Sequence, residues 1–143
     1  MIVRRGTSAR IWSRQRKELT DRFPDIAAAA ARQLNDGAVV DGELVIFLDG
    51  RLSFDALQRR LVTAPAKARQ LVASTPASYV AFDLLAYGGV DLRTQRWTVR
   101  RARLDVLTQE VVDVGRDLRV GWELSDGFPL GPRRSLCPTL MPG

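Results

Sequence analysis

Apolar and polar positions alternate along this chain in two different ways, one typical of strands and one typical of helices. Period-two or continuous apolar runs predict strands at Met1 to Val3 with Arg10 to Ser13, at Val39 to Phe47 and at Tyr79 to Tyr87. The first pair forms a predicted hairpin around Arg5-Gly6-Thr7. Asp49-Gly50 after the second run is typical of a two-residue hairpin turn.

Helical segments lie between these strands. Proline suits the first turn of a helix and alanine is the strongest helix former, so a helix is predicted from Pro24 to about Leu34. Ser53 is placed to cap a short helix in which Phe54, Leu57 and Leu61 recur at helical spacing. Two further helices are predicted at Ala66 to Val72 and at Thr98 to about Val111, the latter with Leu104, Leu107 and Val111 on one face. The whole pattern predicts an α+β fold with largely antiparallel sheets.

Composition narrows the class of protein. A chain of 143 residues with 45% apolar content predicts one domain. No apolar run approaches the roughly 20 residues of a membrane span, and Met1 to Gly6 lacks the core of a signal peptide, so no membrane partner and a cytoplasmic location are expected. Histidine is absent and Cys137 is the sole cysteine. This excludes Ser-His and Cys-His pairs and leaves carboxylates as metal ligands.

The segment Asp41-Gly42-Glu43 sets two carboxylates and a glycine inside an apolar strand. Because side chains alternate along a strand, Asp41 and Glu43 share one face, and Gly42 lets another group approach the backbone. One interpretation is the wall of a ligand or metal site. The other is an ordinary edge strand with one face in water.

The formal net charge of +6 is carried almost wholly by arginine, because only Lys17 and Lys67 among the 22 basic residues are lysines. Basic clusters occur at Arg4-Arg5, Arg14-Gln15-Arg16, Arg59-Arg60 and Arg100-Arg101-Ala102-Arg103. Such clusters could contact nucleic-acid phosphates without reading sequence. The favoured alternative for any one cluster is a solvated helix face or a bias from the base composition of the genome.

Several short motifs occur in a fixed order along the chain. They are Ser13-Arg14, Leu19-Thr20-Asp21-Arg22-Phe23-Pro24, Asp41-Gly42-Glu43-Leu44-Val45, Phe54-Asp55-Ala56-Leu57-Gln58-Arg59-Arg60-Leu61, Phe82-Asp83-Leu84-Leu85 and Asp91-Leu92-Arg93. In this order and spacing they resemble the adenylation domain of bacterial ATP-dependent DNA ligases. The resemblance covers Ile11 to about Leu107.

The resemblance implies a partial nucleotidyltransferase (ATP-grasp-like) adenylation domain over residues 1–112, followed by a divergent Pro/Gly-rich tail over 113–143. It also implies ATP held between two sheets, with Mg²⁺ as a second cofactor and nicked double-stranded DNA as the partner. One sheet is expected to lack a central strand. Apolar side chains such as Val45, Phe47 and Val80 would then lose their cover.

Three residues match the family's nucleotide pocket. Phe82 would stack on adenine, or else be a core phenylalanine in a buried strand. Glu43 would contact the ribose or a magnesium ion, or else pair with a neighbouring arginine. Arg14 would bind the ribose or phosphate side of the nucleotide, although Gln15-Arg16 replaces the family's frequent Asn-Gly and alters the expected turn. Asp41 and Asp83 are expected to be structural.

The nucleophile of the family is missing. These ligases form a lysyl-adenylate in a Lys-x-Asp-Gly motif, and neither Lys17 nor Lys67 stands in that context. Past Leu107 the chain offers Glu110 and Glu123 but no lysine. The sequence therefore predicts no catalytic residue and a chain truncated at both ends that cannot adenylate itself. The alternatives are a non-catalytic, arginine-rich nucleic-acid-binding remnant and a gene fragment with no function of its own.

Overall fold

The computed structural model describes residues 1–111 and 118–120, with side chains for residues 1–107. The predicted boundary at residue 112 lies outside the described residues and stays a prediction, and Cys137, Glu110 and Glu123 lie outside the described side chains. The strands are β1 (Ile2–Arg5), β2 (Ser8–Ile11), β3 (Val39–Leu48), β4 (Arg51–Leu52), β5 (Ala77–Tyr87), β6 (Val90–Asp91) and β7 (Leu118–Val120). The helices are α1 (Pro24–Gln33), α2 (Phe54–Val62), α3 (Pro65–Ser74) and α4 (Trp97–Val111), with a 3₁₀ turn η1 (Thr20–Arg22).

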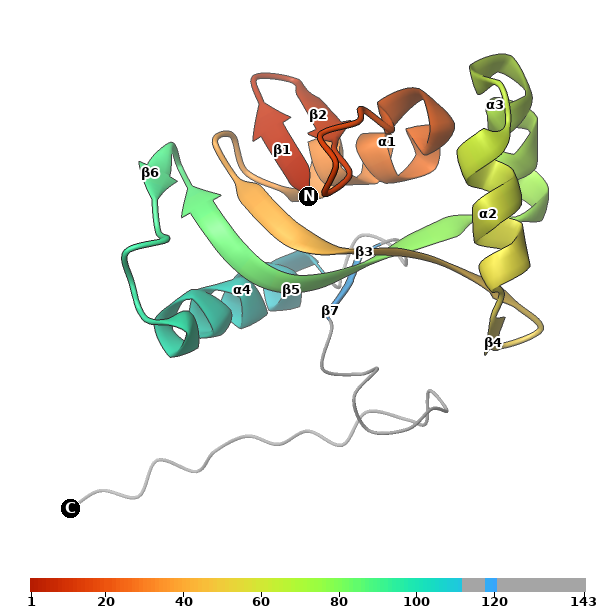
Figure 1. Ribbon diagram of the computed structural model, residues 1–143. Coiled ribbons are helices and arrows are strands. Elements are labelled where there is room, and N and C mark those ends of the chain that lie inside the picture. The colour runs from red at the N-terminus through yellow and green to blue at the C-terminus, as the bar shows by residue number, and fades with distance from the viewer. Residues whose placement is uncertain (112–117, 121–143) are drawn as a thin grey trace.

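Helices and strands are arranged as an α+β domain, which confirms the predicted fold class. In Figure 1 the β1–β2 hairpin and α1 lie on one side of the long β3–β5 pair, and α4 lies on the other. The strand order is β2-β1-β3-β5-β6, with β4 paired to the far end of β3. Every described pairing is antiparallel except that of β7, which runs parallel to β5.

The described strands form one continuous sheet, whereas two sheets were expected from the resemblance. The reason is the length of β3 and β5, which pair from Val39 opposite Ala86 to Ile46 opposite Ala77. This long ladder carries β1 and β2 at one end and β4 at the other. Whether a central strand is missing stays a prediction.

The turn predicted at Asp49-Gly50 and the helix cap predicted at Ser53 are both present. Asp49 and Gly50 both have positive φ, 50° and 76°, as the two-residue turn between β3 and β4 requires. Ser53 Oγ accepts a hydrogen bond from the Ala56 N–H at 3.3 Å and caps α2. Phe54, the first residue of α2, is 69% exposed.

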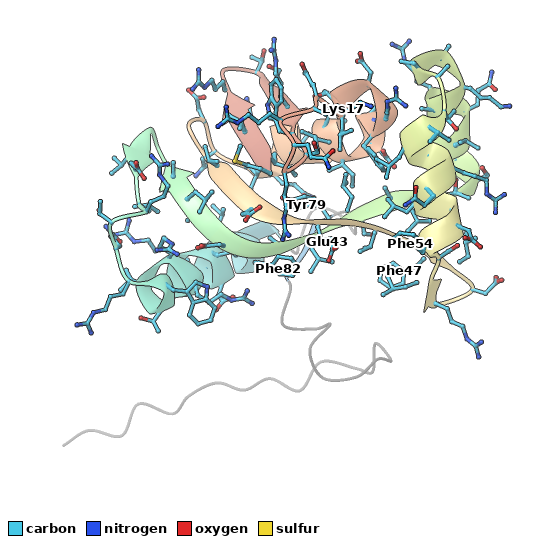
Figure 2. All side chains as sticks on the ribbon, in the orientation of Figure 1. Lys17, Glu43, Phe47, Phe54, Tyr79 and Phe82 are labelled. Carbon is cyan, nitrogen blue, oxygen red and sulfur yellow. The ribbon has the colours of Figure 1, made fainter. Side chains whose placement is uncertain are left out.

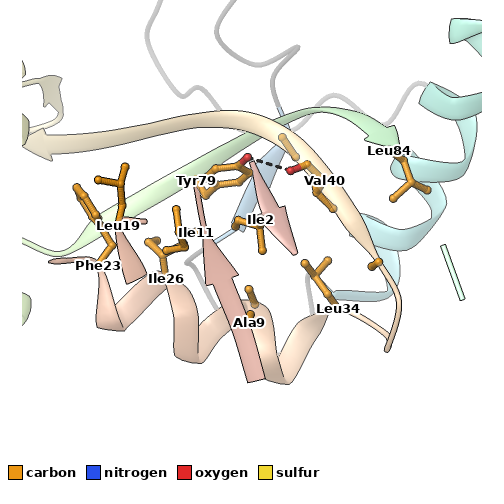
Figure 3. Packing of buried hydrophobic residues seen from close by; sticks show 14 of the residues in the cluster. Ile2, Ala9, Ile11, Leu19, Phe23, Ile26, Leu34, Val40, Tyr79 and Leu84 are labelled. Atoms are coloured by element: carbon orange, nitrogen blue, oxygen red, sulfur yellow. Dashed lines mark hydrogen bonds between the residues drawn. The ribbon is translucent and has the colours of Figure 1, made fainter. Parts of the chain in front are cut away.

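The hydrophobic core lies between the sheet and α1, as Figure 3 shows. Ile2, Ile11, Phe23, Ile26 and Tyr79 are each at most 1% exposed. Of the side chains expected to lose their cover, Val45 and Val80 are instead buried, at 8% and 1% exposure, and Phe47 is partly buried. Helices α2 and α4 contact β3 and β5 and cover these strands.

Candidate functional site

A cavity of about 230 Å³ lies where the segment after β2 meets the β3–β5 pair. Its wall includes all three residues that matched the family's pocket, Arg14, Glu43 and Phe82, and also Trp12, Asp41 and Tyr79. These side chains come from three separate segments of the chain. In Figure 2 Glu43 and Phe82 lie below the β3–β5 ribbon, and Lys17 lies above it.

Gly42 is needed for the way the cavity is built. A Cβ added to this residue would lie 2.2 Å from the Val80 carbonyl oxygen and 2.7 Å from Cε1 of Tyr79. The close approach expected at this glycine is therefore real, but the approaching group is the protein's own β5 strand and not a ligand. Gly42 brings the two strands together beneath the cavity.

Tyr79 is the buried aromatic residue of the wall. Its hydroxyl donates a hydrogen bond to the Val40 carbonyl at 3.2 Å. Burial, assisted by the negative charge of Asp41, raises the pKa of Tyr79 well above its usual value. Tyr79 therefore stays neutral at physiological pH and serves as a packing and hydrogen-bonding element, not as a base.

Phe82 sits at an irregularity in the sheet. Gly42 lies opposite Ala81 and Asp41 lies opposite Asp83, so Phe82 has no partner on β3. A residue in such a bulge can be directed away from the ordinary alternation. Phe82 is 36% exposed and lines the cavity. The alternative of a core phenylalanine is therefore wrong, and the ring is accessible to a ligand.

Glu43 is exposed on β3 and lines the same cavity. Within the described part of the chain it makes no ion pair, so the alternative of a salt bridge to an arginine finds no support there. Nor do the described residues contain a group of three or more potential metal ligands. Mg²⁺ commonly takes only one or two protein carboxylates and completes its shell with phosphates and water, so Glu43 with Asp41 beside it fits that ion.

Arg14 belongs to a tight loop between Ser13 and Lys17. The Ser13 N–H donates to the Lys17 carbonyl at 2.9 Å, and Ser13 Oγ accepts from the Lys17 N–H at 3.1 Å. Arg16 has φ of 60°, a left-handed backbone that favours glycine. The loop therefore has a left-handed residue where the family frequently has glycine, and the substitution places the strain on Arg16.

The basic clusters divide into internal and exposed residues. Arg60 is fully buried, so both predictions for it, a place on a solvated helix face and a contact with a phosphate, are wrong. Its guanidinium pairs with Asp25 at 2.5 Å. Arg100 pairs with Asp83 at 2.8 Å, which agrees with a structural role for that aspartate. Arg5, Arg14 and Arg16 are exposed.

Both lysines are exposed, as expected for bystanders. Lys17 is in the loop after Arg14 and Lys67 is in α3, and neither lines the cavity. Within residues 1–107, therefore, no lysine amine lies at the cavity.

A larger and more open cavity, of about 620 Å³, lies between α4 and the end of β5. Its wall is mostly apolar, with Leu84, Val99, Val106 and Leu107, and among the residues with described side chains Arg103 is its one charged member. A nucleotide needs polar partners for its ribose and phosphates. The smaller cavity, with Arg14, Asp41 and Glu43, is therefore the better candidate despite its size.

Trp12 and Tyr79 were not identified as wall residues from the sequence. The sequence placed both residues only in predicted strands, Arg10 to Ser13 and Tyr79 to Tyr87. The only feature of the sequence that pointed to such a wall residue was Gly42, because a glycine in a strand allows another residue to pack closely against its backbone. Which neighbour that is depends on the register between β3 and β5.

None of the described helices has both the length and the hydropathy of a membrane span.

Comparison with known proteins identifies the family. The sequence profile of the ATP dependent DNA ligase domain matches residues 1–116. Among curated relatives, DNA ligase C2 of Mycolicibacterium smegmatis is 40% identical over 105 residues, covering 73% of this chain and 30% of that protein. DNA ligase C of Mycobacterium tuberculosis is 38% identical over 121 residues, covering 84% of this chain and 34% of that protein. The chain belongs to the ATP-dependent DNA ligase domain family.

A solved structure agrees on the fold. A mycobacterial DNA ligase D complexed with ATP and MES aligns with a TM-score of 0.60 at 24% sequence identity, over 83% of this chain and 35% of that one. This chain spans about a third of the length of the curated relatives described above.

Proposed function

We propose that this chain is the nucleotide-binding part of an ATP-dependent DNA ligase adenylation domain, and that the cavity of about 230 Å³ receives the adenosine portion of ATP. The observation that supports this most strongly is the convergence of Arg14, Glu43 and Phe82, from three segments, on one cavity. Each had been matched to the family's pocket from sequence alone.

Each residue has a role suited to its chemistry. The accessible ring of Phe82 stacks on the adenine, a contact contributing about 1–3 kcal/mol. Glu43 accepts hydrogen bonds from the ribose or holds Mg²⁺, which supplies charge neutralisation next to the phosphates. Arg14 directs its fork of donors to the ribose or phosphate side.

Binding by this chain alone is expected to be weak. Ligand pockets usually have about 300–1,000 Å³, so a cavity of about 230 Å³ covers a base and a sugar but not a triphosphate. The chain also has no lysine beside the cavity to hold phosphates. Charge-assisted hydrogen bonds of that kind are among the stronger polar contacts.

In an intact ligase the bound AMP would be transferred to a 5′-phosphate at a nick, and the nick would be sealed by the 3′-hydroxyl. The first covalent step needs an amine nucleophile. Neither lysine of this chain is followed by x-Asp-Gly, so the 143-residue chain by itself is proposed to bind nucleotide without becoming adenylated.

Calorimetric titration with ATP and Mg²⁺ tests the proposal. We expect a Kd on the order of 0.1–1 mM, weakened at least about fivefold by Phe82→Ala and by Glu43→Ala, since each removes a contact worth about 1 kcal/mol or more. Phe54→Ala is the matched control, because Phe54 is exposed but does not line the cavity. Equal affinity in all four proteins would refute the proposed site.

The arginine-rich alternative has one observation in its favour. Arg10, Arg16 and Lys17 are exposed and lie within the same N-terminal region as Arg14. A nucleic-acid-binding remnant would bind DNA in a strongly salt-dependent manner that ATP does not change. A nucleotide pocket predicts instead that ATP binding is largely unaffected by Arg10→Ala.

A further inference from the structure

The position of Phe82 is not fixed by the strand ladder that fixes its neighbours. Ala81 is paired with Gly42 and Asp83 with Asp41, and Phe82 lies between them without a partner. A bulged residue loses the register constraint of the sheet. Another part of the molecule must therefore determine where its ring lies.

Helix α4 supplies that constraint through two consecutive arginines. Arg101 Nη1 donates to the Phe82 carbonyl at 3.2 Å. Arg100 Nε and Nη2 donate to the two carboxylate oxygens of Asp83 at 2.9 and 2.8 Å. The two side chains of the Arg100–Asp83 pair are 15% and 18% exposed, so the pair is well shielded from water.

The ion pair also removes an electrostatic problem at the bulge. Asp83 lies opposite Asp41 in the register, and like charges on opposed residues destabilise a strand pair. A bidentate arginine neutralises Asp83 and fixes its orientation at the same time. Arg100 is itself held by a bond from Nη1 to the Gln95 carbonyl at 2.6 Å.

We propose that Arg100 is a positioning residue for Phe82: by clamping Asp83 onto α4, with Arg101 holding the Phe82 carbonyl, it keeps the bulge in the form that presents the ring to the cavity. The inference rests on the proposed nucleotide-binding function of that cavity. It assigns α4, which does not line the cavity, a part in recognising the base.

The test compares AMP with ribose 5-phosphate as probes of the full chain. Arg100→Gln should weaken AMP binding about fivefold and leave ribose 5-phosphate binding unchanged, because only AMP carries a base to stack on Phe82. Arg100→Lys, which keeps the charge but not the bidentate fork, should fall between wild type and Arg100→Gln. Arg103→Gln on the same helix is the matched control, since Arg103 is exposed and does not line the smaller cavity that holds Phe82.

A double-mutant cycle separates positioning from general destabilisation. Adding Arg100→Gln to Phe82→Ala should cost little further AMP affinity, because the residue being positioned is already gone. Equal losses for AMP and ribose 5-phosphate, or additive losses in the cycle, would mean that Arg100 only stabilises the fold and would overturn the inference.

Hydrogen exchange of the ligand-free protein gives a readout that does not depend on binding. In Arg100→Gln the amides of residues 77–87 should exchange about fivefold faster than in wild type, while those of α1 and those of the Arg103→Gln control stay unchanged. If the wild type fails to bind AMP, the proposed function is wrong. Unchanged exchange at residues 77–87 would overturn the positioning role itself.

Discussion

Arg16 is the clearest example of a single residue in conflict with its local backbone. Its φ of 60° belongs to a region that costs an L-residue about 1–2 kcal/mol. The loop keeps this conformation because both backbone and hydroxyl groups of Ser13 bond to Lys17. The sequence shows an arginine at a position where the family frequently has glycine, and the structure shows that this arginine has a left-handed backbone.

Replacing Arg16 by glycine should stabilise the protein. Relief of the strain is partly offset by the greater freedom of glycine in the unfolded chain, so we expect a gain of about 0.5–1 kcal/mol in the free energy of unfolding. Urea denaturation measures this change. Gln15→Gly, at a neighbouring residue without positive φ, should be neutral or destabilising. A loss of stability in Arg16→Gly would show that the loop is not strained.

Short motifs that resemble a family led to Arg14, Glu43 and Phe82, and all three residues line one cavity. That they bind a nucleotide stays a prediction. The burial of Arg60 was missed, because nothing in its helical surroundings indicates that Asp25, 35 positions earlier, lies beside it. Partners of that kind are set by tertiary packing and not by local pattern.

At the scale of elements, Arg60 joins parts of the fold that the strand ladder does not connect. From α2 it bonds to Asp25 in α1, to the Arg22 carbonyl at 2.8 Å and to the Thr75 carbonyl at 2.9 Å. Asp25 also accepts a bond from the Ala77 N–H at the start of β5. The ring of Phe23 lies 5.3 Å from the guanidinium. The pair thus connects α1 and α2 to the strand that carries Phe82.

Removing one partner of this buried pair should be strongly destabilising. Asp25→Ala leaves the arginine charge buried without its counter-ion, for which losses of about 3–5 kcal/mol are usual. Thermal or urea unfolding measures the loss. Asp91→Ala, which breaks the exposed pair with Arg93, is the control and should have little effect. Similar small effects for both substitutions would contradict the structural role assigned to Arg60.

Elements governed by local chemistry were predicted closely. The Asp49-Gly50 turn, the Ser53 cap and the start of α1 at Pro24 all depend on residues within a few positions. The single continuous sheet, the bulge at Phe82 and the parallel pairing of β7 depend on contacts between distant segments. No local pattern in the sequence carries that information.

At the scale of the whole molecule, the proposed nucleotide cavity occurs in a chain in which neither Lys17 nor Lys67 is followed by x-Asp-Gly. We predict that the chain, incubated with labelled ATP and Mg²⁺, forms no covalent AMP adduct, since a phosphoramidate requires a suitably placed amine. Mass spectrometry under non-acidic conditions checks this, with Lys17→Arg and Lys67→Arg variants as controls that should look identical to wild type. An adduct mapped to Lys17 or Lys67 would show that one of these exposed lysines can reach the cavity.

The most direct measurement is an NMR titration of the full chain with ATP that maps which backbone amides shift. If the cavity between β2, β3 and β5 holds the nucleotide, the shifts should cluster at residues 12–14, 41–44 and 79–83, and Phe82→Ala should need about fivefold more ATP to reach the same shifts. Shifts that cluster instead along α4, around the larger cavity beside Val99 and Val106, would contradict the assignment of the nucleotide site, as would the absence of any saturable shift.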